Sequence, residues 1–184
     1  MLKKVLFMDS NHDNVVKSFS TGEECYGIDH VANRIAVSVQ GFGIQIFDDE
    51  GILIKTIALA CTAFVFLKSN ICYIDIKRNM LRCCDLEGSN MWELKLPVDR
   101  FDQYSSLTSN EYGNIYITDR FSDQVFLVTE DGARYRTLLQ NSDGLYNVAG
   151  ISLNTKKQQL LLCTTRNKMA VLYDVSMQPR DEDI

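Results

Sequence analysis

Proline and linker-type segments are scarce in this sequence. Proline occurs only twice in 184 residues, at Pro97 and Pro179, and no stretch rich in glycine or serine divides the chain. Flexible connections between domains usually contain such residues. We therefore expect residues 1–176 to form a single domain, followed by a disordered polar tail at residues 177–184.

Long hydrophobic runs are missing as well. The apolar segment Val5–Met8 is shorter than the core of a signal peptide, and the longest apolar stretch, Thr56–Leu67, is shorter than a membrane-spanning helix. The sequence also contains no Asn-x-Ser/Thr site for N-glycosylation. These absences predict a cytoplasmic protein that does not act at a membrane.

Metal-binding and cofactor motifs are absent too. The six cysteines form no C-x-x-C pair, and the only two histidines, His12 and His30, complete no zinc-binding spacing with them. A chain of this size needs no disulfide framework, so we expect free, buried thiols and no cofactor.

The sequence also has little excess charge. Its formal net charge is -5 at pH 7, and its hydrophobic and charged fractions, 46% and 23%, are those of an ordinary folded protein. A mildly acidic balance disfavours nonspecific binding to nucleic acid or anionic membranes but permits a local basic patch.

What the sequence does contain is a module repeated about five times. Each copy has a β-rich run that ends in a small or acidic residue, then a turn, then a second β-rich run closed by an acidic turn. The intervals between the ends of the first runs are 29, 37, 44 and 46 residues, close to the roughly 40 to 50 residues of common propeller blades. These end residues serve as anchors: Asp9, Ser38, Asp75, Asp119 and Thr165.

Two further positions recur at fixed distances from the anchors. An aliphatic residue stands six positions after each anchor: Val15, Ile44, Leu81, Val125 and Val171. A glycine stands thirteen positions after each of the first four anchors: Gly22, Gly51, Gly88 and Gly132. Because β-branched residues favour strands and glycine permits tight hairpins, the module predicts antiparallel strands joined by short turns.

One more strand candidate precedes each first run, which makes four strands per module. We therefore predict an all-β fold, a β-propeller of four-stranded antiparallel blades that is partial or small and holds about four blades. The short first interval predicts that the first unit lacks its outermost strand as well as its first. The predicted units are a partial blade at 1–22, blades at about 25–59, 62–96 and 104–140, and a last partial blade at 148–176.

Two segments resemble the NHL-repeat propellers found at the C-terminus of tripartite-motif proteins, especially those of invertebrates. Glu111–Asp119, which reads EYGNIYITD and is followed by Val125–Leu127, is similar to the family's "GNIYVTD…VxVF" core, and Cys25–Ile28 also fits. The resemblance covers nearly the whole chain and implies blades without naming a ligand. The family's rings usually have six blades, whereas this sequence shows about three full modules and two partial ones. Any ubiquitin-ligase activity would need RING and B-box domains, whose Cys/His arrays are absent here.

Two strand features admit both a functional and a structural interpretation. The adjacent Cys83 and Cys84 could form a thiol switch or pack within a strand, and Trp92 could anchor a partner or pack between blades. We favour packing for each.

Polar turn residues admit two interpretations as well. His12 beside Asp13, or His30 beside Asp29, could perform acid–base chemistry or simply lie in turns. The acidic clusters at 48–50 and 130–131 could bind calcium, but they lack the alternating ligand order of a calcium loop, so solvated hairpin turns are favoured.

Charge is unevenly divided between the two faces of the predicted propeller. The turns between second and third strands share one face and carry five basic residues, and these are the candidate binding residues: Lys77, Arg78, Arg120, Arg166 and Lys168. Only Asp13 and Asp123 oppose them in these turns, although other loops on this face carry Glu23, Glu24, Asp99, Asp102 and Asp143. The turns on the opposite face carry only acidic charges: Asp48, Asp49, Glu50, Asp85, Glu87, Glu130, Asp131 and Asp174.

These features predict a binding protein rather than an enzyme. The leading hypothesis is a protein-interaction module that recruits a partner or a ligase substrate through its loops, and the alternative is recognition of single-stranded RNA by the basic face. A propeller hydrolase with a metal in its channel ranks last, because the innermost strand candidates Val65–Leu67, Leu107 and Ile151 are apolar. An incomplete ring would expose sheet edges, so a homodimer is also expected in that case.

Overall fold

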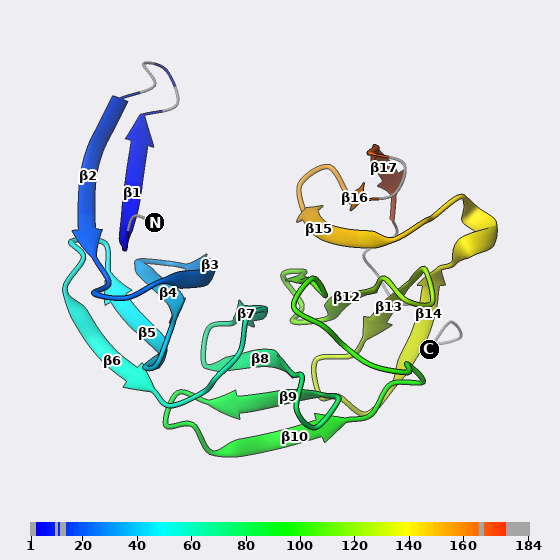
Figure 1. Cartoon of the computed structure of the whole chain (residues 1–184), viewed down its shortest axis with the longest axis horizontal. Coiled ribbons are helices and arrows are strands. Elements are labelled where there is room, and N and C mark those ends of the chain that lie inside the picture. Colours follow the sequence, from blue (N-terminus) through cyan, green and yellow to red (C-terminus); the bar gives the residue numbers. More distant parts are fainter. Residues whose placement is uncertain (1–2, 10, 12–13, 166–167, 176–184) are drawn as a thin grey trace.

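The chain folds into a series of small antiparallel sheets that follow one another around an arc (Figure 1). The computed structural model describes residues 3–9, 11, 14–165 and 168–175. Within them lie three four-stranded sheets, flanked by a two-stranded sheet at the N-terminal end and a three-stranded sheet at the C-terminal end. The fold is therefore an all-β propeller of four-stranded antiparallel blades, as the repeat predicts. The predicted tail at 177–184 lies outside the described residues.

The strands occur in the order of the sequence. The N-terminal hairpin consists of β1 (Lys4–Asp9) and β2 (Asn14–Ser20), and the first blade of β3 (Cys25–Val31), β4 (Arg34–Val39), β5 (Gly43–Asp48) and β6 (Leu53–Ile57). The second blade consists of β7 (Phe64–Phe66), β8 (Asn70–Asp75), β9 (Met80–Asp85) and β10 (Asn90–Leu94), and the third of β11 (Leu107–Ser109), β12 (Ile115–Asp119), β13 (Gln124–Val128) and β14 (Tyr135–Leu139). After a short 3-10 turn, η1 (Asn141–Asp143), the fourth blade consists of β15 (Val148–Asn154), β16 (Gln159–Thr164) and β17 (Ala170–Asp174).

Each of the first three blades is apolar on both faces because it lies between two neighbours. In the third blade, Tyr116 pairs with Leu127 across β12 and β13, and Ile117 pairs with Phe126. Successive side chains of a strand point to opposite faces. Tyr116 and Leu127 consequently pack toward the fourth blade, whereas Ile117 and Phe126 pack toward the second.

The same alternation explains the adjacent cysteines. Cys83 enters the hydrophobic cluster between the second and third blades, and Cys84 enters the cluster between the first and second. Both thiols are almost fully buried. The two residues therefore pack in the core, as favoured from the sequence.

Trp92 also has a packing role. It lies on β10, where a Cβ added to Gly132 of the next blade would come within 2.4 Å of Trp92 Cε3. Gly132 sits in the β13–β14 turn at φ +69°, a left-handed conformation that suits glycine. The indole thus fits against a glycine of the neighbouring blade, which confirms the inter-blade interpretation.

The strand pairing corrects two of the sequence anchors. In the second and third blades, the residue before the anchor pairs with the residue six positions after it, as Thr118 pairs with Val125. In the fourth blade, Cys163 pairs with Ala170, so the equivalent anchor is Thr164 rather than Thr165. In the first blade, the β4–β5 turn is one residue shorter, so the anchor shifts to Val39. A shift of one residue exchanges the two faces of a strand, and composition alone does not reveal it.

The N-terminal hairpin lies over the first blade and presents β2 as an outermost strand. A Cβ added at Gly51 would lie 2.6 Å from the ring of Phe19 on β2. Trp92 of β10 contacts Gly132 of the next blade in the same way. The ring of Phe19 also lies 4.5 Å from that of Phe47, centroid to centroid.

An ion pair repeats this relation. Lys17 Nζ of β2 lies 2.9 Å from Glu50 Oε2 in the hairpin of the first blade, and Lys55 of β6 pairs in the same way with Glu87 of the second. Because β6 is the outermost strand of its blade, β2 occupies an outermost position too. The prediction that this unit lacks its outermost strand is therefore wrong; counting from the anchor could not distinguish a third strand from a fourth.

Within the described ranges, no helix has the length and hydrophobicity needed to cross a bilayer.

Candidate interaction face

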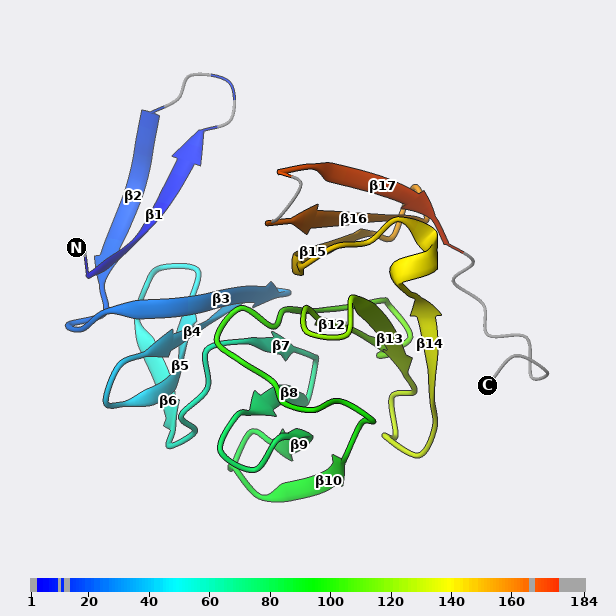
Figure 2. The same ribbon diagram turned by 45° about the vertical axis from the view of Figure 1, so that its right-hand side comes forward.

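The two faces of the arc differ in their connections. One, which we call the loop face, carries the turns between second and third strands and the longer connections between blades, residues 21–24, 58–63, 95–106 and 140–147. The opposite face carries the acidic hairpins between third and fourth strands, and we call it the hairpin face. Figure 2 shows the connections from a second direction.

In two turns between second and third strands, the side chain of the last turn residue forms hydrogen bonds to the connection that leads to the next blade. Asn79 Oδ1 accepts a hydrogen bond of 2.6 Å from the amide of Phe101, and Asn79 Nδ2 donates to the carbonyl of Asp99 over 3.1 Å. In the third blade, the carboxylate of Asp123 accepts hydrogen bonds from the amide of Asn147 and from Asn141 Nδ2. These bonds give the inter-blade loops of this face a defined shape.

The predicted basic residues lie on this face in three separate blades. Lys77 and Arg78 are exposed in the β8–β9 turn, Arg120 lies in the β12–β13 turn, and Lys168 is exposed in the β16–β17 turn; Arg166 lies outside the described residues. Arg78 Nε lies 3.8 Å from Asp75 Oδ2. The four described residues come from three turns, and nothing in the described structure joins these cations of one blade to those of another through a shared ion pair or ring contact.

Arg120 belongs instead to a compact cluster of aromatic and charged side chains. Its guanidinium carbon lies 4.5 Å from the centre of the Tyr104 ring and 5.2 Å from that of Phe121. Arg120 Nη2 lies 2.9 Å from Asp102 Oδ2. The guanidinium of Arg100 covers the Phe121 ring as well, at 4.5 Å. We call these five residues the aromatic–arginine cluster.

A tight turn in the connection between the second and third blades presents Tyr104. Asp102 Oδ1 accepts a hydrogen bond of 2.9 Å from the amide of Tyr104, and the amide of Ser105 donates to the carbonyl of Asp102 over 3.1 Å. The Tyr104 and Phe121 side chains remain 49% and 41% exposed. Arg120 Nε is buried and finds no hydrogen-bond acceptor among the residues described. The cluster thus combines the exposed rings of Tyr104 and Phe121 with a hydrogen-bond donor, Arg120 Nε, that has no acceptor among the described residues.

Tyr104 also lines a cavity of about 450 Å³ near the middle of the arc. The innermost strands of all four blades contribute to it, through residues 26–28, 62–64, 103–107, 149 and 151. Gly27 allows the walls to approach, since an added Cβ would lie 2.8 Å from the carbonyl oxygen of Thr62. Tyr26, which is also exposed, lines the same cavity, so two tyrosines contribute to its wall.

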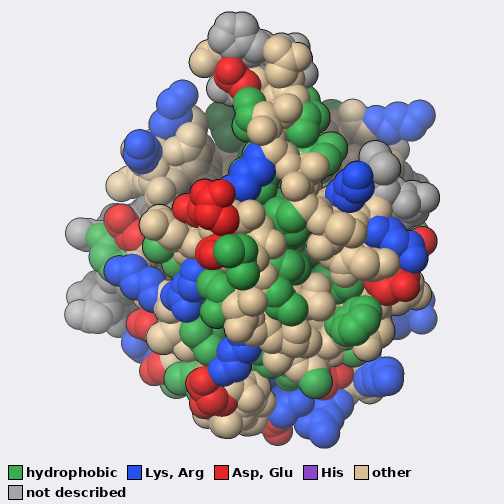
Figure 3. Space-filling model, turned by 90° about the vertical axis from the view of Figure 1, so that its left-hand side faces the viewer, with side chains coloured by type: hydrophobic (Ala, Val, Ile, Leu, Met, Phe, Trp, Pro, Cys, Tyr) green, Lys and Arg blue, Asp and Glu red, His purple; other side chains and the backbone are tan. Residues whose placement is uncertain are grey.

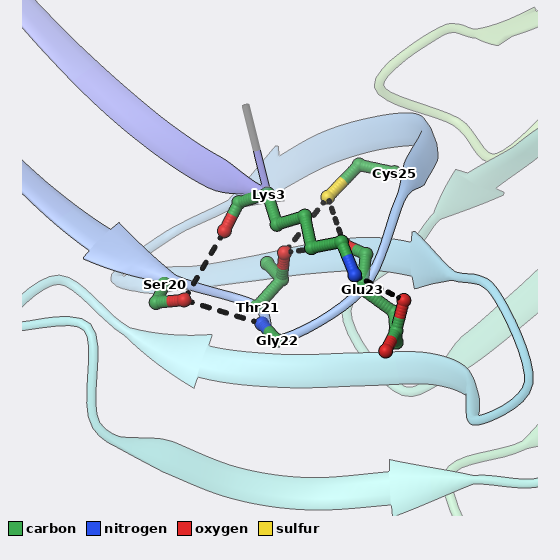
Figure 4. Close-up of polar contacts among 6 residues, drawn as sticks. All are labelled: Lys3, Ser20, Thr21, Gly22, Glu23 and Cys25. Atoms are coloured by element: carbon green, nitrogen blue, oxygen red, sulfur yellow. Dashed lines mark hydrogen bonds and ion pairs between the residues drawn. The ribbon is translucent and has the colours of Figure 1, made fainter. Parts of the chain in front are cut away.

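The N-terminal part of the loop face is a network of hydrogen bonds (Figure 4). Lys3 Nζ lies 2.6 Å from Glu23 Oε2, which neutralises one of the acidic residues of this face. The hydroxyl of Thr21 bonds the carbonyl of Glu23 and lies 3.1 Å from Cys25 Sγ. These contacts hold the β2–β3 connection against the start of β1.

On the hairpin face, the acidic side chains hold their own turns. Asp85 Oδ1 accepts hydrogen bonds from the amides of Glu87 and Ser89, at 2.9 and 2.8 Å. The hydroxyl of Thr129 and the amide of Ala133 bond Asp131 and hold the pKa of its carboxyl below the usual range. These contacts are those of the hairpin turns expected from the sequence. No group of three or more His, Cys, Asp or Glu side chains placed to hold a metal occurs in the described part of the chain.

The described histidine lies next to structural carboxylates. Asp29 Oδ2 accepts a hydrogen bond of 2.7 Å from the amide of Phe66 in the second blade, and burial raises the pKa of this carboxyl. His30 Nε2 lies 3.6 Å from Asp49 Oδ1 in the neighbouring turn. His12 and Asp13 lie outside the described residues.

The sequence identified Arg120 but not its aromatic neighbours. Arg100, Asp102 and Tyr104 stand in the longest of these connections between blades, and they meet Arg120 and Phe121 where the end of the connection pairs with β12, through Ser106 and Thr118. The available signal was the alternation of charged and aromatic residues in a twelve-residue connection, 95–106, longer than the others. Long ordered loops often carry function.

Comparison with known proteins places the chain among the β-propellers. No family model matches the sequence, and no curated protein matches it by sequence. Among solved structures, it is similar to Hsv2 of Kluyveromyces lactis, with 10% identity and a TM-score of 0.62 over 96% of this chain and 56% of that one. The computationally designed Ika4 protein is similar at 8% identity and a TM-score of 0.55, over 85% of this chain and 94% of that one.

A third solved structure is also similar in fold to this chain at low sequence identity. Streptogramin B lyase is 16% identical, with a TM-score of 0.53 over 82% of this chain and 54% of that one. The chain thus spans little more than half the length of the Hsv2 and lyase chains. At these identities the likeness defines a fold, the β-propeller, and no activity.

Proposed function

We propose that this propeller is a protein-interaction module that binds its partner through the aromatic–arginine cluster and the adjoining cavity. The observation that supports the proposal most directly is the exposure of Tyr104 and Phe121 around the held guanidinium of Arg120. Tyrosine and arginine are the residue types that dominate the energetic centres of protein interfaces. Because Asp102 and the stacked rings already order the arginine, little side-chain entropy is lost when a partner binds.

The test compares the partner affinities of variants in which aromatic residues of similar solvent exposure are replaced by alanine. A partner isolated with the wild-type protein should be purified and its affinity measured by calorimetry. We expect Tyr104→Ala and Phe121→Ala each to weaken binding by about 10-fold or more, the effect of losing an interface anchor. Tyr112→Ala removes a ring that is 51% exposed in the β11–β12 turn, on the hairpin face, and serves as the matched control. Equal affinities for all four proteins would refute the proposal.

Recognition of single-stranded RNA is the second candidate. It is supported by the exposed side chains of Lys77 and Lys168 and by the exposed rings of Tyr104 and Phe121 on the same loop face, since aromatic rings can stack on bases. Filter binding of labelled RNA at two salt concentrations tests it, because each lost phosphate contact lowers the salt dependence. Binding that is insensitive to salt, or unchanged in Lys77→Glu with Lys168→Glu, would exclude it.

The NHL character of the repeats belongs to the same proposal. The segment Glu111–Asp119 supports it, and it implies a tripartite-motif type of partner or substrate recognition without catalysis by this chain. The six free cysteines support a reducing, cytoplasmic location. We propose no catalytic role for the described residues.

A further inference from the structure

The fourth blade exposes a surface that the other blades bury. In each of the first three blades, two cross-strand pairs on the second and third strands face the next blade. In the second blade these pairs are Cys72 with Cys83 and Ile74 with Leu81, and all four side chains are at most 2% exposed. The corresponding pairs of the first and third blades are Ala36 with Ile46, Ser38 with Ile44, Tyr116 with Leu127, and Thr118 with Val125.

The fourth blade has the same pairs at the same register. Leu161 pairs with Leu172 and Cys163 pairs with Ala170 across β16 and β17. Leu161 and Leu172 are 40% and 56% exposed, and Cys163 and Ala170 are exposed as well. Four side chains of a blade-packing face therefore lie in solvent. We call them the C-terminal face.

The N-terminal hairpin exposes a surface of the opposite kind. Val5, Phe7 and Phe19 point toward the first blade, so the intervening residues of β1 point away from it. Leu6 is 44% exposed, and Met8 and Val15, which pair across the hairpin, are 58% and 52% exposed. We call these three residues the N-terminal face. Figure 3, which views the molecule from the side of this hairpin, shows hydrophobic side chains along this side of the molecule.

The interior of the molecule shows what each end face is shaped to meet. At every internal junction, the face that a blade turns toward the C-terminus packs on the face that its successor turns toward the N-terminus. Among the described residues, one surface of each kind has no neighbouring blade, and the views in Figures 1 and 2 show the two ends apart. Two copies can therefore supply each other with the surface that each lacks, as repeat arrays do at their junctions.

We propose that this chain associates with a second copy head to tail, the C-terminal face of one copy packing on the N-terminal face of the other. The contact continues the blade stacking of the molecule and buries Leu161 and Leu172 against Leu6, Met8 and Val15. It is a heterologous interface, in which two different surfaces meet, and it can extend beyond two copies. It lies at the ends of the arc, so its presence or absence is independent of the partner proposed for the loop face.

The test measures molar mass by light scattering across a range of protein concentrations. The wild-type chain should exceed the monomer mass as concentration rises. Leu161→Asp with Leu172→Asp blocks the C-terminal face, and Leu6→Asp with Met8→Asp blocks the N-terminal face. Each double variant should remain monomeric, because a carboxylate buried in an apolar contact weakens association on the order of 100-fold or more.

Mixing the two double variants provides the decisive result. Each retains the surface that the other has lost, so an equimolar mixture should form a dimer and nothing larger. Met91→Asp, at a residue 54% exposed on β10 of the central part of the arc, should associate as the wild type does. Circular dichroism of every variant establishes that it is folded.

Cys163 offers an independent readout at the centre of the C-terminal face. Its thiol is exposed in the single chain, so its reaction with a maleimide should slow as the protein concentrates. In the variant with a blocked N-terminal face, the rate should not depend on concentration. A wild-type chain that stays monomeric at the highest concentration, or an N-terminal variant that self-associates as the wild type does, would overturn the proposal.

Discussion

At the scale of single residues, burial separates the cysteines into reactive and inert groups. Cys61, Cys72, Cys83 and Cys84 are buried, whereas Cys163 is exposed. Cys72 Sγ lies 2.7 Å from Cys83 Sγ across β8 and β9. The cross-strand neighbour of Cys83 is thus a second thiol, Cys72. The sequence did not indicate this pairing, because only Cys84 is adjacent to Cys83 in the chain.

We predict that Cys163 reacts rapidly with a maleimide in the native monomer, while Cys61 and Cys84 react only when the protein unfolds. The thiolate is the reactive form. Burial raises the pKa of Cys61 to about 12 and that of Cys84 to about 11, and the hydrogen bond to Cys83 together with burial also raises the pKa of Cys72. Peptide mass spectrometry after labelling at about pH 8 and about pH 9 measures the reaction. Fast labelling of Cys84 at either pH would contradict the prediction.

A second prediction concerns the contact between Gly132 and Trp92. Gly132→Ala should destabilise the protein by more than about 2 kcal/mol, because the added methyl group meets the indole and the backbone is left-handed. Gly41→Ala, at φ +77° with no atom within 4 Å of the added Cβ, should cost only the backbone penalty of about 1 kcal/mol. Urea denaturation followed by Trp92 fluorescence measures both. Equal losses would show that the indole moves aside.

At the scale of elements, the turns of the loop face act as clamps between blades. Asn79 and Asp123 both have positive φ, 56° and 54°, and both hold the connection that leads to the next blade. Lys168, at φ 52°, stands at the equivalent place in the fourth blade. The left-handed backbone positions these side chains, and their hydrogen bonds set the shape of the loops that carry the candidate site.

We therefore predict an order of stability for two substitutions of Asn79. Asn79→Gly retains the backbone conformation but leaves the amide of Phe101 without its acceptor, which should cost about 1–3 kcal/mol. Asn79→Ala loses the same bond and adds about 1 kcal/mol of left-handed strain. Thermal and urea unfolding measure the difference. If both variants match the wild type, Asn79 does not clamp the loop.

At the scale of the whole molecule, each blade is supported only by its neighbours. The second and third blades have a neighbour on both faces, whereas β1 and β17 belong to units with one. Repeat arrays distribute stability in this way, as a sum of units and junctions. The ends of the arc should consequently open before its centre.

Hydrogen exchange followed by mass spectrometry tests this order. Amides of β8, β9, β12 and β13 should exchange slowest, and amides of β1 and β17 fastest, since local opening at an end breaks one junction and not two. At concentrations where copies associate head to tail, protection of β17 should increase. Uniform protection along the chain would indicate that the arc unfolds as one cooperative unit.

The strand and turn pattern was accessible from the sequence because it is local. Alternating β-branched residues such as those of Ile115–Asp119, and glycines such as Gly132 at hairpin turns, specify strands and turns within a few residues. The recurrence of that pattern then indicated blades. Local chemistry could not specify whether Thr164 or Thr165 ends the strand, because both residues fit the composition. The pairing of Cys163 with Ala170 decides it, and the strand ends at Thr164.

The candidate site was only partly accessible for the same reason. Arg120 was recognisable as a charged turn residue, but its ion pair with Asp102 and its contact with Tyr104 join the β12–β13 turn to the connection that precedes β11.

The sequence by itself determined an all-β chain of repeated four-stranded units, because strand propensity, face alternation and turn glycines act over short distances. Tertiary structure alone decided which side chains meet between blades, which cations are held by carboxylates, and which blade faces are left uncovered at the ends. Those outcomes depend on contacts between residues far apart in the chain, and a single register shift of one residue reverses them.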